Sequence, residues 1–185
     1  NIRYLHHLGE VTYFSPLADT SLPDAGFVYL PGGYPELYLA ALSANRQMLQ
    51  SIRRYVESGG KLLAECGGMM YLCDEIRDKN GDVYPMAGVL HQSATMENMK
   101  LRLGYRTLLY NETRLKGHEF HYSRLVEQQN PLPSCAVAYT AKGVETDTPL
   151  YHYKNVWAGY THLYWADPVG DRKSTRLNSS HGKLS

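Results

Sequence analysis

The sequence predicts an α/β protein with a mostly parallel sheet, helices on both faces of that sheet, and an antiparallel extension. In the first half, short apolar runs alternate with amphipathic stretches. Such alternation of strand and helix favours a parallel sheet covered by helices. In the second half, strand-like runs follow one another with little helical periodicity, which indicates antiparallel pairing. The length of 185 residues fits one domain.

The first half supplies the helices and the parallel strands. Residues 1–8 predict the last turns of a helix that ends at Gly9. No strand precedes this helix, so we expect the first strand of the sheet to be missing. Apolar residues at spacings of three and four predict the later helices, and Gly59 and Gly60 stop them. The expected strands are 11–14, 25–30 and 61–65, and the expected helices are 35–44 and 45–57.

The second half supplies the antiparallel extension. Its apolar and β-branched runs are short, and turn residues separate them. The expected strands are 86–90, 100–110, 135–140 and 156–160.

Composition excludes several classes of protein. A net charge of +1 is too small for a nucleic-acid-binding surface, and no apolar run approaches the roughly 20 residues of a membrane span. The three cysteines have no paired metal-ligand spacing, so we expect no metal site. No secretory signal is evident either, and we expect a cytoplasmic protein.

The last 15 residues differ from the rest. Residues 171–185 contain only two apolar side chains, so we expect them to be disordered, and they resemble a non-native tail. Four of the 19 basic and one of the 18 acidic residues lie there, which leaves residues 1–170 with a net charge of −2. The expected domain is therefore 1–170.

The most informative segment surrounds Cys66. The apolar strand 61–65 runs into this cysteine, and Gly67, Gly68 and a helix follow at once. Small neighbours allow a sharp strand-to-helix turn that exposes a nucleophile, and the helix N-terminus favours its thiolate. The alternative is a buried core cysteine before a glycine turn. We assign that core role to Cys73, two turns along the expected helix.

A thiolate that attacks an amide also needs donors for the oxyanion and a base. Gly32 and Gly33 end the neighbouring strand and, with the N–H of Gly67, predict an oxyanion hole. Seven histidines lie in residues 1–170, and spacing alone does not select the base. His162 is favoured because it follows the expected strand 156–160, and His121 is second. His118 lies in the same extended run as His121.

At these residues the sequence resembles the class I glutamine amidotransferases of the cobyrinate and cobyric acid synthase type. The resemblance covers roughly residues 5–167. It implies a flavodoxin-like fold, with Cys66 as the nucleophile, His162 as the residue that activates it, and Gly33 and Gly67 as oxyanion donors. Glu119 and His121 belong to a family signature near the site. The matching segments are 14–17, 31–36, 64–68, 103–105, 117–123 and 160–163.

The chain departs from the wider class in two places. Tyr164 stands where many class I amidotransferases have a glutamate that orients the histidine, so the resemblance implies a Cys–His dyad. The sequence also contains no phosphate-binding loop. The resemblance therefore implies that ATP and magnesium belong to a missing N-terminal synthetase domain, which would bring the corrinoid acceptor. In this chain we expect glutamine as the ligand and no cofactor.

Two alternatives remain open at this stage. The same fold could amidate cobyric acid, a nickel-sirohydrochlorin or a cell-wall precursor, although residues 34–36 favour the a,c-diamide synthases. The chain could instead be a catalytically silent, flavodoxin-like binding domain. Labelling of Cys66 by an electrophilic glutamine analogue would separate an enzyme from a silent domain.

Overall fold

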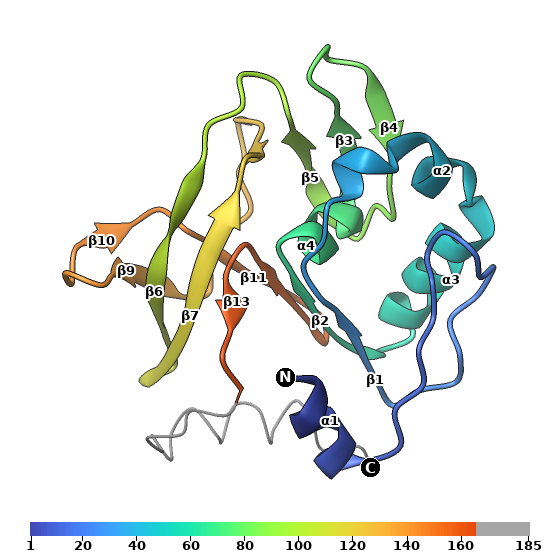
Figure 1. Ribbon diagram of the computed structural model, residues 1–185, viewed down its shortest axis with the longest axis horizontal. Coiled ribbons are helices and arrows are strands. Elements are labelled where there is room, and N and C mark those ends of the chain that lie inside the picture. Colours follow the sequence, from blue (N-terminus) through green and yellow to red (C-terminus); the bar gives the residue numbers. More distant parts are fainter. Residues whose placement is uncertain (166–185) are drawn as a thin grey trace.

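A computed structural model describes residues 1–165, so the tail 171–185 and the end of the expected domain lie outside the described residues. A four-stranded central sheet separates two layers (Figure 1). Helices α2 and α3 lie on one side, and a five-stranded antiparallel sheet lies on the other. The predicted fold class is confirmed.

The helices form close to where the apolar spacing places them. In α3 the buried side chains are Met48, Leu49, Ile52 and Val56, and the side chain of Asn45 caps the first turn by accepting a hydrogen bond from the N–H of Met48. The described helices are α1 (Ile2–Leu8), the 3-10 helix η1 (Pro35–Leu37), α2 (Leu39–Ala44), α3 (Arg46–Glu57) and α4 (Gly67–Leu72). No helix in residues 1–165 is long and apolar enough to cross a membrane.

The C-terminal ends of three parallel strands lie at one edge of the central sheet. Strands β1 (Phe27–Leu30), β2 (Lys61–Glu65) and β12 (Val156–Gly159) are parallel, and β11 (Leu150–Tyr153) pairs antiparallel with β12. Leu30 is in register with Ala64, and Glu65 is in register with Gly159. The segments after the three parallel strands therefore start side by side, where ligands bind in open α/β sheets.

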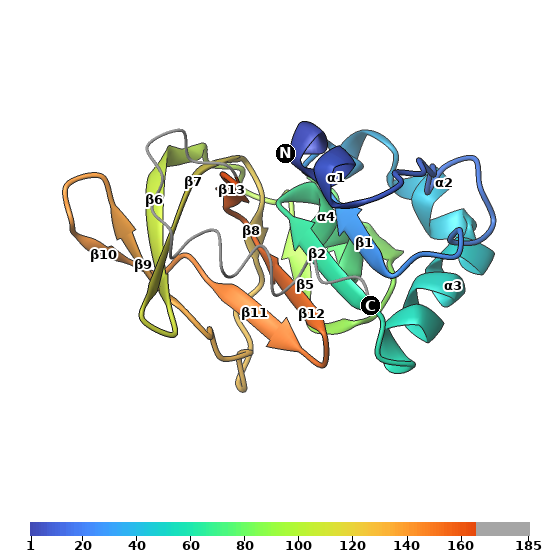
Figure 2. The ribbon, with the colours of Figure 1, turned by 90° about the horizontal axis from the view of Figure 1, so that it is seen from below.

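The two faces of the central sheet pack against different partners (Figure 2). One face, which includes Val28 and Ala64, packs on α2, α3 and α4. The other face, which includes Leu63, packs on the antiparallel sheet and on the partly buried Leu5 of α1. The antiparallel sheet has the order β10-β9-β6-β7-β13. Its strands are β6 (Arg102–Tyr110), β7 (Thr113–His121), β9 (Val137–Thr140), β10 (Glu145–Thr146) and β13 (His162–Leu163).

A third sheet, which the sequence did not predict, extends from the end of α4. It has the order β4-β3-β5-β8 and mixes parallel and antiparallel pairs. Cys73 starts β3 instead of continuing the helix, and it is fully buried, so the core assignment is confirmed and the helical one is wrong. The strands are β3 (Cys73–Arg77), β4 (Val83–Pro85), β5 (Leu90–Thr95) and β8 (Arg124–Leu125).

Two predicted strands are absent from the described residues. Residues 11–14 are irregular and lead into a turn in which the Asp19 carboxylate accepts a hydrogen bond from the N–H of Ser15. Within 86–90, the N–H groups of Met86 and Val89 donate to carbonyls of Asp74 and Leu72 instead of to a ladder. This stretch is a buried connection, and its strand begins only at Leu90.

Candidate active site

Cys66 forms the sharp bend that the sequence predicts. Its backbone angles are φ 51° and ψ −110°, a region that L residues rarely adopt. The Cys66 N–H donates to the carbonyl of Gly159 at 2.8 Å, which fixes the cysteine to the end of β12. Strand β2 ends at Glu65 and helix α4 begins at Gly67.

The Cys66 thiol is less exposed than expected. The residue is only 5% exposed, and its sulfur lies 3.8 Å from the carbonyl oxygen of Phe120 on β7. Burial raises the pKa of the thiol to about 11 despite a hydrogen bond from the N–H of Gly67, and nearby carboxylates, Glu36 first among them, add to the increase. The expectation of an exposed sulfur is therefore wrong, and burial favours its protonated form. Helix α4 is only six residues long, and the partial positive charge at its N-terminus does not offset the effect of burial on the pKa of the thiol.

The predicted oxyanion glycines lie beside the bend. A β-carbon on Gly67 would approach the carbonyl oxygen of Gly33 to 2.6 Å and the ring of Pro35 to 2.9 Å. A β-carbon on Gly32 would overlap the His162 ring, whereas one on Gly33 would meet nothing within 4 Å. Only glycine therefore fits at positions 32 and 67. Residues 32–33 contact both the backbone bend at Cys66 and the His162 ring.

His162 lies on the short strand β13, which pairs with β7. The half-buried ring stacks on His118, with ring centroids 4.8 Å apart and planes 12° apart. Burial lowers the pKa of His162, and the neighbouring His118 and His121 lower it further. These surroundings favour the neutral imidazole, the form that can accept a proton.

Glu119 and His121 lie in a buried ionic cluster on the opposite side of β7 from His118. Glu119 is 2% exposed and accepts hydrogen bonds from Arg106 Nε at 2.7 Å and Thr148 Oγ1 at 2.9 Å. His121 Nδ1 lies 2.8 Å from the carbonyl of Ser123, and Nε2 lies 3.4 Å from Glu119. Both ring nitrogens of His121 are thus engaged, whereas no described side chain forms a hydrogen bond with the ring of His162.

Sequence reasoning missed Glu65, which links the segment of Cys66 to the segment of His162. This carboxylate accepts hydrogen bonds from the Tyr29 hydroxyl at 2.5 Å and from the N–H of Leu163 at 2.8 Å. It is 1% exposed, and burial raises its pKa to about 7. Glu65 directly precedes Cys66 and accepts a hydrogen bond from Leu163, the residue after His162. A carboxylate directly after the apolar residues 62–64 and before Cys66 was the signal for it.

A cavity of about 780 Å³ opens between α1, residues 10–14 and β1. Glu65, His118, His162 and Tyr164 form one end of its wall, whereas Cys66 does not line it. The cavity therefore reaches the histidine side of the site. No cluster of three or more metal-ligating side chains occurs within residues 1–165.

Comparison with known proteins shows the family of the chain. Residues 1–169 match the CobB/CobQ-like glutamine amidotransferase domain. The chain is 39% identical over 170 residues to hydrogenobyrinate a,c-diamide synthase of Pseudomonas aeruginosa, which covers 89% of this chain and 37% of that protein. It is 38% identical over 174 residues to cobyrinate a,c-diamide synthase of Fusobacterium nucleatum, which covers 89% of this chain and 38% of that protein.

Solved structures support the fold. A crystal structure of a glutamine amidotransferase superposes with a TM-score of 0.55 at 18% identity, covering 86% of this chain and 78% of the other. PurLQS from Thermotoga maritima gives a TM-score of 0.55 at 14% identity, covering 91% and 84%. The chain spans well under half the length of the curated relatives it matches. It belongs to the CobB/CobQ-like glutamine amidotransferase domain family.

Proposed function

We propose that this chain hydrolyses glutamine with Cys66 as the nucleophile and His162 as the base. The observation that carries the proposal is the strained bend at Cys66, with residues 32–33 in contact with both the bend and the His162 ring. A backbone conformation this costly persists at functional sites, where the surrounding structure enforces it.

The resting thiol is protonated in this proposal, because burial raises its pKa to about 11. When glutamine binds, His162 takes the thiol proton as the sulfur attacks the side-chain amide carbon. The N–H groups of Gly33 and Gly67 stabilise the oxyanion. Collapse breaks the carbon–nitrogen bond, and His162 returns the proton to the leaving nitrogen, which departs as ammonia. Water then hydrolyses the γ-glutamyl thioester to glutamate, with His162 accepting the water proton and passing it to the sulfur.

We further propose that the ammonia amidates the a and c side-chain carboxylates of a cobyrinate-type corrinoid. This acceptor follows from the names of the relatives, which are a,c-diamide synthases. ATP and magnesium would activate the acceptor carboxylates on a synthetase domain outside these residues, and the reaction would take place in the cytoplasm. Cobyric acid, a nickel-sirohydrochlorin and a cell-wall precursor are the competing acceptors.

The test uses Cys66→Ser in the intact protein that carries this chain. We expect glutamine-dependent amidation of cobyrinate to fall by at least about 10³-fold, because the hydroxyl is a far weaker nucleophile. Ammonia-dependent amidation should persist, because it bypasses the glutaminase. Cys73→Ser is the matched control, since Cys73 is buried in the core. Retained glutamine-dependent activity in Cys66→Ser would contradict the assignment of Cys66 as the nucleophile. If the wild-type protein amidated another acceptor but not cobyrinate, the proposed acceptor would be wrong.

A further inference from the structure

The His162 ring is held without a carboxylate. Within residues 1–165 no Asp or Glu side chain forms a hydrogen bond with either of its ring nitrogens. Tyr164, two residues further on, directs its hydroxyl to His118 Nδ1 at 3.1 Å. A catalytic imidazole needs a fixed orientation, which a carboxylate supplies in triads. Another group must therefore orient this ring.

His118 is in the position to do so. It is directly opposite His162 in the β7–β13 ladder, so backbone pairing sets the two rings face to face. The rings are nearly parallel, 12° apart, at a centroid distance of 4.8 Å. On another side, the Cε1 edge of His162 abuts Gly32, so closely that a β-carbon there would overlap it. The stack limits tilting of the ring, and the glycine limits its rotation.

The tyrosine in turn fixes the second imidazole. The Tyr164 and His118 rings lie 5.7 Å apart at 31°, in addition to their hydrogen bond. We infer that His118, held by Tyr164, is the positioning residue for His162 and takes the place of the orienting carboxylate. This inference rests on the proposed function, in which His162 is the base.

The stacked pair also has an electrostatic effect. Two protonated imidazoles in contact repel each other, so His118 favours the neutral form of His162. A neutral His162 accepts the thiol proton at lower pH than an isolated histidine would. The other titratable groups near the ring are His121 of β7, which also lowers the pKa of His162, and Glu65, Tyr29 of β1 and Tyr164, which line the same cavity.

The experiment measures steady-state glutaminase activity of His118→Ala and His118→Phe in the intact protein. Removing the ring should lower kcat by about 10- to 100-fold, the cost of a misplaced catalytic group, while KM for glutamine changes less than about threefold. Phenylalanine keeps the stack but carries no charge, so it should restore most of kcat. In both variants the pKa of His162 rises, and the acid limb of the pH–rate profile should move to higher pH.

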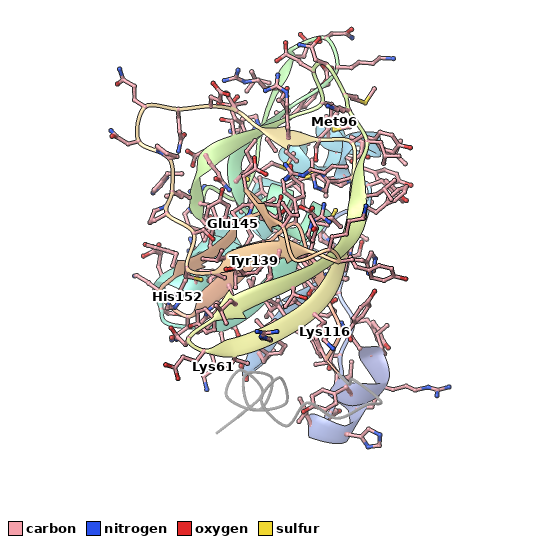
Figure 3. All side chains as sticks on the ribbon, turned by 90° about the vertical axis from the view of Figure 1, so that its left-hand side faces the viewer. Lys61, Met96, Lys116, Tyr139, Glu145 and His152 are labelled. Carbon is pink, nitrogen blue, oxygen red and sulfur yellow. The ribbon has the colours of Figure 1, made fainter. Side chains whose placement is uncertain are left out.

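Two further variants separate positioning from general packing. Tyr164→Phe keeps its ring and loses the hydrogen bond to His118, so it should show a smaller loss of kcat. His152→Ala is the matched control: its imidazole lies on β11 and stacks on Trp157 at 4.2 Å and 11°. In the view of Figure 3 the labelled His152 stands apart from the labelled Lys116 of β7. This control should keep the kcat and pH profile of the wild type. Thermal unfolding of each variant checks that it is folded.

The outcomes separate the inference from the function on which it rests. Wild-type activity in His162→Ala would overturn the proposed function itself. Loss of activity in His162→Ala together with a wild-type kcat and pH profile in both His118 variants would overturn only the inference. An equal loss in His118→Ala, His118→Phe and His162→Ala would make His118 a reacting group and would also overturn the positioning role.

Discussion

At the scale of single residues, Glu65 shows how burial and hydrogen bonding compete. Two donors, the Tyr29 hydroxyl and the Leu163 N–H, favour its ionised form, whereas burial favours the protonated form and prevails. Because its pKa in the folded protein is about 7 and its ordinary value is 4.5, the unfolded chain ionises first as the pH rises. Protonated Glu65 thus contributes its full stability below pH 4.5, and this contribution is lost as the pH rises through 7.

We therefore expect Glu65→Gln to remove part of the pH dependence of stability. The amide can accept from the Leu163 N–H and donate to Tyr29, but it does not titrate. Urea unfolding at pH 5 and pH 8 should show a smaller difference in unfolding free energy for the variant than for the wild type. Glu127→Gln, at an exposed position, is the control and should leave that difference unchanged. An undiminished difference in Glu65→Gln would contradict the raised pKa.

The residues of the candidate site were only partly predictable. Cys66 and the glycines stand out because a sharp bend at a sheet edge needs small neighbours, which leaves a local signal in the sequence. His162 was selected by its place after a strand. The contact of Glu65 with the N–H of Leu163 and the stack of His118 on His162 were missed, because both depend on pairing between strands far apart in the sequence. Burial of the Cys66 sulfur by β7 was unforeseeable for the same reason.

At the scale of elements, the loop after β1 packs against the His162 ring. Gly32 abuts the imidazole, whereas the neighbouring Gly33 faces open space. The two glycines are adjacent in the sequence and differ only in what surrounds their α-carbons. The loop therefore offers a matched pair of substitutions.

We expect Gly32→Ala to lower kcat by about 10²-fold, because the new methyl group displaces the His162 ring from its position. Gly33→Ala should lose much less, since its methyl group meets no atom within 4 Å and the backbone N–H is retained. Steady-state glutaminase assays of both variants, with thermal unfolding as a check, make the comparison. Equal losses would show that the loop backbone, and not the His162 ring, is what the alanine disturbs.

At the scale of the whole molecule, a buried polar cluster ties the antiparallel sheet to the centre. Glu119 on β7 is bound by Arg106 of β6 and by Thr148, which precedes β11. His121 stacks on Tyr160 at 3.7 Å, just beyond β12. Although burial alone would raise it, the pKa of Glu119 is lowered by these hydrogen bonds and by the neighbouring arginines.

We expect Glu119→Ala to cost about 3–5 kcal/mol in unfolding free energy, because it leaves the buried Arg106 guanidinium without its partner. The stability from ionised Glu119 is present above pH 4.5 and is lost as the pH falls below it, so the variant should also lack that acid-dependent loss. Urea unfolding between pH 3 and pH 7 measures both effects. Glu57→Ala removes an exposed ion pair with Lys154 and should change stability little. A similarly small change in Glu119→Ala would contradict the importance of the cluster.

The fold class followed from the sequence because alternating strand and helix leaves few packing solutions. The helices 39–44 and 46–57 and the strands 61–65 and 102–110 formed close to their expected bounds. The third sheet could not be foreseen, since its strands are short and carry polar residues without a clear alternating apolar pattern. Residues 11–14 have the pattern of a strand but no partner strand within the described residues, and pairing decides whether a strand forms.

The left-handed backbone at Cys66 has a consequence for selection. Holding a non-glycine residue there costs about 1–3 kcal/mol, which the rest of the molecule must supply. Cys66→Gly would relieve that cost but would also remove a core side chain that is only 5% exposed, so its gain in unfolding free energy is smaller than the strain alone. In the proposed function the need for the sulfur, and not the backbone, accounts for a cysteine at this strained position.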